Sequence, residues 1–252
     1  MNKTVFHLGL DASQVQNVDI ALVPGDPGRV PKIAKHLKGA KELAYHREFC
    51  SMRGQYEGRE VLICSTGIGG PSAAICVEEL AMLGVRRFLR IGTTGALQDR
   101  IEPGDVIIPT GAVRMDGASL HMAPLAYPAV ADYHLVHQLV KGVADKGFPH
   151  HVGIIASSDT FYQGQSRQDS YLQGFVHQEV ANRLSELKAL NVLSFEMECA
   201  TLFTQCASYG LSAAAILGVL LNRNRHEFPT EASAAKTEER VIHAALTCIG
   251  IL

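Results

Sequence analysis

The chain has 252 residues, of which 47% are hydrophobic and 19% charged, and its formal net charge is −2. This composition is typical of a globular protein with a sizeable core, and it lacks the basic field that nucleic-acid or membrane-surface binding requires. No uncharged apolar run reaches the roughly 18 residues of a spanning helix, and the N-terminus has no signal-peptide pattern, so we expect a cytoplasmic protein without a membrane partner. Six cysteines without a CxxC pair and eleven histidines without an HExxH motif predict reduced thiols and no transition-metal site.

Short apolar runs alternate with longer helical patterns along the chain. The predicted strands are 19–23, 60–65, 86–92, 105–110, 152–157 and 213–221, and the predicted helices are 27–37, 71–83, 132–146, 179–190, 198–209 and 232–249. This alternation predicts an α/β protein, with one domain over residues 1–252 and helices on both sides of a mostly parallel or mixed sheet. Because ligands bind at the carboxyl ends of strands in such sheets, the strand-to-loop junctions are the candidate site.

Two early junctions are rich in glycine. In "LVPGDPGRV", Gly25 lets backbone N–H groups approach an anion and Arg29 can cap it from the first helical turn, although a turn with a solvated arginine explains the same residues. In "CSTGIGGPSAAICVEEL", Ser72 stands where a GxGxxG motif that starts at Gly67 needs glycine, and no Walker motif follows. This second junction is either a tight turn only or a turn packed against a ligand.

Two further junctions carry buried or clustered polar groups. Arg90 lies inside the apolar run of "FLRIGTTGALQ", where an unpaired guanidinium is very costly, so it must meet an anion of the protein or of a ligand. In the polar loop "SSDTFYQGQSRQDSY", Gln165 and Arg167 can present an amide and a guanidinium to one planar ligand. The alternative is a solvated loop.

Two carboxylates, Glu196 and Glu198, interrupt the apolar run "NVLSFEMECATLF". Burial of unpaired charges costs several kcal/mol, so both need partners. They lie where an extended pattern becomes helical, so neither the strand nor the helix periodicity fixes their directions. They could be the acid and nucleophile of a glycosidase, or they could hold a ligand.

Several motifs together resemble one known family. "STGIGGPSAAICVEEL" follows the signature of the nucleoside phosphorylase-I family, and "VPGDP", "HREF", "RIGTTGAL", "DGASLH", "SSDTFY" and "FEME" occur in the order found in its uridine phosphorylase branch, over essentially the whole chain. The resemblance implies a single-domain three-layer α/β/α fold with a central mixed, partly barrel-like sheet. It also implies reversible phosphorolysis of uridine to uracil and ribose 1-phosphate in pyrimidine salvage, with inorganic phosphate as co-substrate and no organic cofactor.

The resemblance implies specific residues for each part of the site. The phosphate would be bound by Gly25, Arg29, Arg90 and Thr93, with Arg47 from a neighbouring subunit. The nucleoside would be bound by Thr93, Phe161, Gln165, Arg167, Glu196, Met197, Glu198 and Arg223, with His7 from the neighbour. Arg90, Thr93, Gln165, Arg167 and Glu198 are the implied catalytic residues.

The resemblance also bears on cations and assembly. Family members can bind a monovalent cation, K⁺ or Na⁺, between subunits, and the matching positions are Glu48, Ile68 and Ser72. Since Arg47 and His7 would complete a neighbour's site, we expect a homo-oligomer with a catalytic dimer, assembled as a hexamer by three dimers.

Some positions depart from the family pattern. Gln163 replaces a usual proline and Ser166 a common glutamate, so the preference among uridine, deoxyuridine and thymidine stays open. Gly28 and Cys199 are further departures. Arginines in "LNRNRHEF" stand where purine-cleaving relatives carry an aspartate, which favours a pyrimidine over the purine alternative. A phosphate-independent hydrolase would leave the arginines without a role, and a nucleoside-binding protein without catalysis is the non-enzyme alternative.

Overall fold

The computed structural model describes residues 4–18, 20–175, 177–225 and 229–251. The strands are β1 (Ile20–Leu22), β2 (Lys38–His46), β3 (Phe49–Tyr56), β4 (Arg59–Cys64), β5 (Arg87–Ala96), β6 (Val106–Met115), β7 (Ala129–Val130), β8 (His150–Ser158), β9 (Ser194–Glu196) and β10 (Ser212–Asn222). The helices are α1 (Arg29–Ala34), α2 (Gly70–Met82), the 3-10 helix η1 (Ala118–His121), α3 (Tyr133–Asp145), α4 (Gln178–Ala181), α5 (Arg183–Ala189), α6 (Cys199–Ser208) and α7 (Glu231–Ile251).

Five of the strands close into a ring. β10 pairs with β6, β6 with β8, β8 with β9, β9 with β5, and β5 again with β10. From β5 the sheet continues through β1, β4, β3 and β2, while β7 pairs with β6. Parallel pairs such as β5–β10 and β6–β8 occur beside antiparallel pairs such as β5–β9. The expected mixed, partly barrel-like sheet is therefore confirmed.

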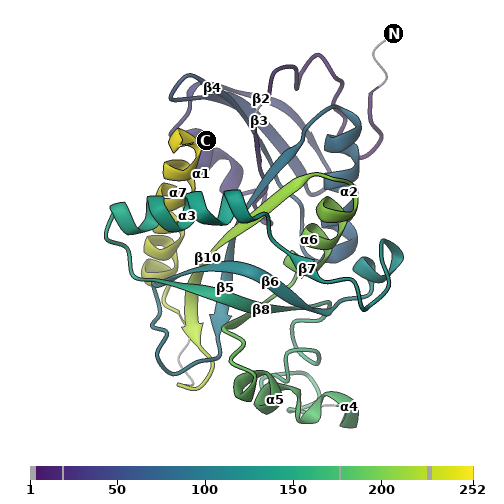
Figure 1. The fold of residues 1–252 in the computed structure, drawn as a ribbon, viewed down its shortest axis with the longest axis vertical. Helices are drawn as coiled ribbons and strands as arrows, with labels where there is room; N and C mark the ends of the chain where they lie inside the picture. The colour runs from purple at the N-terminus through teal and green to yellow at the C-terminus, as the bar shows by residue number, and fades with distance from the viewer. Residues whose placement is uncertain (1–3, 19, 176, 226–228, 252) are drawn as a thin grey trace.

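Helices cover the sheet on two sides (Figure 1). α2 and α6 pack together on one side, and α3 and α7 pack together on the other. Successive side chains of a strand point to opposite faces, and β10 shows the result. Ala213, Ala215 and Leu217 belong to the core under α2 and α6, whereas Ala214 and Ile216 belong to the core under α3 and α7.

The structure differs from the predicted elements at several points, including the short β7 and η1, which were not predicted. The hairpin β2–β3 was not predicted, because β2 is an exposed strand with lysines and a glutamate and shows no buried apolar run. The predicted helix 179–190 is divided at Asn182 into α4 and α5. Strands β5, β6 and β8 continue beyond their predicted ends, to Ala96, Met115 and Ser158, because their last residues remain paired with neighbouring strands. Asp19, the first residue of the predicted strand 19–23, lies outside the described residues.

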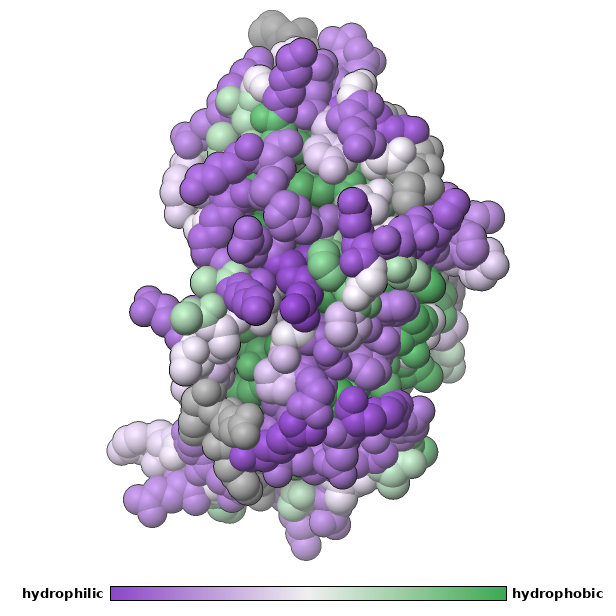
Figure 2. Space-filling model, turned by 90° about the vertical axis from the view of Figure 1, so that its left-hand side faces the viewer, coloured by the Kyte–Doolittle hydropathy of each residue, from purple (hydrophilic) through white to green (hydrophobic). Residues whose placement is uncertain are grey.

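The side of the molecule shown in Figure 2 is mostly hydrophilic, with scattered hydrophobic patches. Within the described residues, no helix is long and apolar enough to cross a membrane.

Replacement of Phe203 in α6 tests how much the core between α6 and the sheet contributes to stability. Its side chain is fully buried, so replacement by alanine leaves a cavity, and we expect Phe203→Ala to lower the free energy of unfolding by about 3–5 kcal/mol. Urea denaturation measures the change. Phe175→Ala is the matched control, because that side chain is 62% exposed. Equal losses in the two variants would contradict the assigned core.

Candidate active site

A cavity of about 890 Å³ opens at the carboxyl ends of the sheet strands. β1 and β4 lead into it through glycine-containing loops, and β5 and β10 contribute residues of the strands themselves. β9 contributes its last two residues and the two that follow, and β8 supplies the loop after it. The lining residues are Gly25, Asp26, Pro27, Arg29, Glu48, Gly67, Ile68, Arg90, Thr93, Thr94, Gly95, Phe161, Gln165, Arg167, Asp169, Phe195, Glu196, Met197, Glu198, Leu220, Leu221 and Pro229. The four junctions and the Glu-Met-Glu segment therefore meet at one place.

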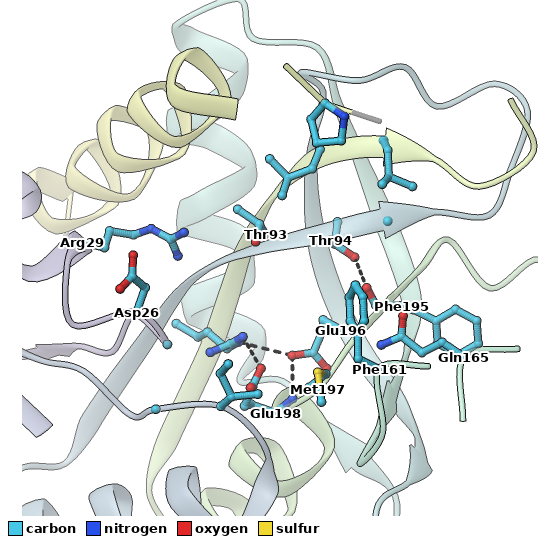
Figure 3. A pocket seen from close by; sticks show the side chains of 18 of the residues that line it. Asp26, Arg29, Thr93, Thr94, Phe161, Gln165, Phe195, Glu196, Met197 and Glu198 are labelled. Carbon is cyan, nitrogen blue, oxygen red and sulfur yellow. Dashed lines mark hydrogen bonds and ion pairs between the residues drawn. The ribbon is translucent and has the colours of Figure 1, made fainter. Parts of the chain in front are cut away.

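The cavity has two chemically different ends (Figure 3). Arg29 and Asp26 lie at one end, and Phe161 and Gln165 lie at the other. Thr93 and the carboxylates of the Glu196–Glu198 segment lie between them. A bound molecule that spans the cavity would therefore meet a cationic end, a middle with acceptors and a planar aromatic–amide end.

Arg90 lies deep in the cavity between two carboxylates. Its Nη2 donates a hydrogen bond to Glu198, and its Nε lies 3.3 Å from Glu196 Oε2. Burial opposes its charge, but Glu198 and Glu196 outweigh burial and raise the pKa of Arg90, so the guanidinium is a cation. Among the described residues, buried Nη1 has no hydrogen-bond partner. Such a donor favours an acceptor supplied by a ligand.

Gly25 leaves open space in front of this donor. A Cβ built at Gly25 would lie 3.7 Å from Arg90 Nη1 and only 3.3 Å from the carbonyl oxygen of Gly67. A larger residue would therefore crowd the entrance to the arginine. Glycine at this position therefore leaves room for a ligand to approach Arg90 closely.

Arg29 is fixed at the same end by two hydrogen bonds. Its Nε donates to Glu238 Oε1 at 2.6 Å, and its Nη1 donates to the carbonyl oxygen of Ile91 at 3.0 Å. Figure 3 shows the guanidinium turned toward Thr93. Thr94 differs from Thr93, because its hydroxyl donates to the carbonyl oxygen of Phe195 at 2.6 Å. Both threonines line the cavity, but the hydroxyl of Thr94 is already bonded within the protein.

Gln165 and Arg167 meet at the other end. The Arg167 guanidinium lies over the Phe161 ring, 3.8 Å from its centroid. Arg223 lies behind the loop and donates from Nη1 to the carbonyl oxygen of Gln165 at 2.5 Å. Burial, together with the neighbouring Arg167, lowers the pKa of Arg223 to about 10. Two close guanidiniums repel each other, and negative charge on a ligand nearby relieves that repulsion.

The two glutamates have different partners. Glu196 accepts hydrogen bonds from the backbone N–H groups of Glu198 at 2.8 Å and Cys199 at 2.9 Å, and from the hydroxyl of Ser157. It therefore caps the N-terminus of α6, where negative charge is favourable. Glu198 accepts from the N–H of Gly69 at 2.6 Å and from Arg90. Burial, with the nearby Glu196, raises the pKa of Glu198 against the opposing effect of Arg90.

Several predicted site residues lie away from the cavity of their own chain. Arg47 is exposed in the turn between β2 and β3, with a φ of 56° that is unusual for a non-glycine residue. His7 is held by Glu79 of α2, with Nδ1 2.7 Å from Oε1. Both were expected to serve a neighbouring subunit, and that expectation stays a prediction.

The predicted cation ligands lie at the rim. The Ser72 hydroxyl lies 3.0 Å from Glu48 Oε1 and within hydrogen-bond distance of the carbonyl oxygen of Thr66, so it can donate to either. Ile68 is 77% exposed. Carboxylate, hydroxyl and carbonyl oxygens are the ligands that a hard cation takes, so the donor set fits K⁺ or Na⁺. Within the described part of the chain, no group of three or more His, Cys, Asp or Glu could hold a metal ion.

The sequence reasoning missed a group of lining residues, most of them apolar. Phe195, Leu220, Leu221 and Pro229 line the cavity, as do the acidic Asp26 and Asp169. Phe195 and the two leucines belong to runs that look like ordinary buried strand, so no local signal separates wall from core. Asp26 could have been found from its place inside the "PGDPG" turn.

The fold and the site together define a class of protein. A family model described as "Phosphorylase superfamily" matches residues 19–252, and the chain belongs to this superfamily.

Individual members of this superfamily have sequences similar to that of this chain. The chain is 50% identical over 238 residues to the uridine phosphorylase of Escherichia coli, which covers 94% of each chain. It is 49% identical over 243 residues to the uridine phosphorylase of Haemophilus influenzae, which covers 96% of each. It is also 41% identical over 213 residues to a guanosine phosphorylase of Halorubrum lacusprofundi, which covers 84% of this chain and 81% of that protein.

Replacing each glutamate by glutamine separates their roles. We expect Glu196→Gln to lower the free energy of unfolding by about 2–4 kcal/mol, because two N–H groups of α6 and Arg90 lose a charged acceptor. Glu198→Gln should cost less stability, since it removes one backbone contact and one ion pair. Urea denaturation of both variants checks the order. A larger loss for Glu198→Gln would contradict the capping role of Glu196.

Proposed function

We propose that the protein catalyses the reversible phosphorolysis of uridine, with inorganic phosphate as the co-substrate and no organic cofactor. The observation that carries this proposal is one cavity with an arginine cluster at one end and the Gln165–Arg167 loop at the other. A nucleoside joins a sugar to a planar base, and phosphate adds an anion on the far side of the sugar. These three parts match the three regions of the cavity. The identity to uridine phosphorylases over nearly the whole chain supports the same substrate.

Phosphate binds at the arginine end. Arg90 offers its unpartnered Nη1, Arg29 offers the edge that is not bonded to Glu238, and Thr93 offers a hydroxyl. Guanidiniums bind phosphate oxygens in pairs and offset its charge. Held in this way, a phosphate oxygen forms a bond to C1′ of the ribose while the C1′–N1 bond breaks.

The electron pair of the broken bond passes to the uracil ring. Uracil spreads this charge over its carbonyl oxygens, where the Gln165 amide and Arg167 can donate hydrogen bonds. Arg223 holds the backbone of Gln165 and adds positive charge behind it. Fixed donors aimed at developing charge are worth roughly 10²–10³ in rate each. The uracil anion gains the proton that the attacking hydrogen phosphate loses as it becomes an ester, and uracil and ribose 1-phosphate are the two products.

The ribose lies over the Met197 segment between the two ends. Glu198 is the carboxylate for the ribose diol, because it has two internal partners, Gly69 and Arg90, whereas Glu196 serves α6, Ser157 and Arg90. A carboxylate also favours the positive charge that develops on the sugar in an oxocarbenium-like transition state. Arg90 keeps Glu198 oriented, so the phosphate and sugar parts of the site are linked through one ion pair.

The site is completed by a second copy of the chain. Arg47 and His7 lie outside their own cavity, and we infer that they reach the phosphate and the 5′-hydroxyl of a neighbour's site. Three such dimers form the proposed hexamer, and the Glu48–Ser72 oxygens at the rim bind the monovalent cation. We further propose that the protein acts in the cytoplasm in pyrimidine salvage.

A panel of nucleosides tests the reaction and its rivals. We expect uracil release from uridine to require phosphate, because phosphate is the nucleophile, and we expect inosine to be a poor substrate. Chromatographic measurement of base release with uridine, deoxyuridine, thymidine, cytidine and inosine checks both points. Release without phosphate would favour a hydrolase, faster inosine cleavage would favour a purine phosphorylase, and binding without turnover would favour a nucleoside-binding protein.

Mixed subunits test the shared site. Arg47→Ala and Glu198→Gln each damage a different half of it, so each variant alone should be nearly inactive. After unfolding and refolding of an equal mixture, half of the dimers carry one of each, and one of their two sites is intact. We expect about a quarter of wild-type activity in the mixture. Activity no greater than the mean of the two single variants would contradict an Arg47 supplied by the neighbour.

A further inference from the structure

The C-terminal helix contacts the proposed phosphate site through a single carboxylate. Glu238 of α7 accepts a hydrogen bond from Arg29 Nε at 2.6 Å and a second, on its other oxygen, from Lys32 Nζ at 2.5 Å. The two residues of the Arg29–Glu238 pair are 209 positions apart in the sequence. Neither composition nor motif gives α7 any role in the reaction.

The contact fixes the plane of the arginine. Glu238 holds the Nε edge, and the carbonyl oxygen of Ile91 holds Nη1, so two separate elements restrain the guanidinium. The side chain is only 11% exposed. The guanidinium lines the cavity and is turned toward Thr93 (Figure 3), so the donors that Glu238 and Ile91 do not occupy can meet a ligand there. An arginine held this way has lost its rotamer freedom before phosphate arrives, and binding need not supply that ordering.

Glu238 is itself well anchored. Burial alone would raise the pKa of Glu238, but the hydrogen bonds from Lys32 and Arg29 outweigh it and hold the pKa below its ordinary value. The group is therefore a carboxylate at neutral pH. Lys32 offsets its charge, so the net repulsion between Glu238 and a phosphate dianion is small.

We propose that Glu238 is a positioning residue for phosphate, acting through Arg29. It touches neither substrate; it holds Arg29 so that the free edge of the guanidinium faces the phosphate position. This inference rests on the proposed function, in which Arg29 binds phosphate. It adds α7, beyond the strand junctions, to the elements that determine phosphate affinity.

Two substitutions of Glu238 distinguish the effect of the position of its carboxylate from the effect of its charge. Glu238→Gln removes the charge, and Glu238→Asp keeps the charge but shortens the side chain by one methylene. Since ordering a long side chain costs enough to change affinity several-fold, we expect both variants to raise the KM for phosphate about threefold to tenfold. The KM for uridine should stay within twofold of wild type. Glu239→Gln is the matched control, because Glu239 is the next residue of α7 and is exposed. Within the described residues, its one ion-pair partner is His243, at 3.9 Å.

A double-mutant cycle with Arg29→Ala shows whether the effect passes through Arg29. In the Arg29→Ala background, Glu238→Gln should leave the KM for phosphate unchanged, since the residue that it positions is gone. Additive effects, an equal rise in the KM for uridine, or a lower KM for phosphate in Glu238→Gln would each overturn the inference. Thermal unfolding with and without phosphate gives a second readout, and both Glu238 variants should show a smaller phosphate-induced shift than Glu239→Gln.

The single variant Arg29→Ala separates failure of this inference from failure of the proposed function. A raised KM for phosphate in Arg29→Ala, with no effect of the Glu238 variants, would overturn only the positioning role. An unchanged KM for phosphate in Arg29→Ala would overturn the phosphate assignment of Arg29 and the inference with it.

Discussion

The charge of Arg90, buried between Glu196 and Glu198, is the constraint on which the rest of the site depends. A guanidinium inside a strand is tolerated only with acceptors around it. Glu198 and Glu196 supply them and are placed by β9 and the first turn of α6. Glu196 also caps α6, and Glu198 receives the N–H of Gly69 at the start of α2. One ion-pair cluster therefore sets the positions of a strand, two helix ends and the centre of the cavity.

This arrangement explains why stability and function are difficult to separate here. The donors of Arg90 that face Glu198 and Glu196 stabilise the fold, and the donor that faces open space, Nη1, is available to a ligand. Arg29 repeats the pattern at the periphery, with one edge bound to Glu238 and another turned into the cavity. In both cases, protein contacts on one edge of a guanidinium orient the remaining edge. Such preorganisation is what aims fixed charges at a reacting group.

The sequence could predict the charged and polar residues of the site better than the apolar residues that line it. Arg90 was expected to meet an anion because its run is apolar, and the structure places Glu196 and Glu198 there. Gln165 and Arg167 were expected to share one ligand, and they line the same cavity. The apolar wall at Phe195, Leu220 and Leu221 could not be predicted, because a residue that faces a cavity from a strand has the same local pattern as one that faces the core. The exposed strand β2 was missed because its polar residues lack the alternation that marks a half-buried strand.

The closed ring of strands has a consequence for biosynthesis. Its members come from residues 87–222, and the last of them, β10, pairs with both β5 and β6. A nascent chain on the ribosome can form β1, β4 and the glycine-rich turns early, but the ring has a gap between β5 and β6 until β10 has left the exit tunnel. Glu238, farther along, emerges later still. Truncated products of interrupted translation that end before β10 therefore contain most of the arginines and glycines of the site but cannot assemble it.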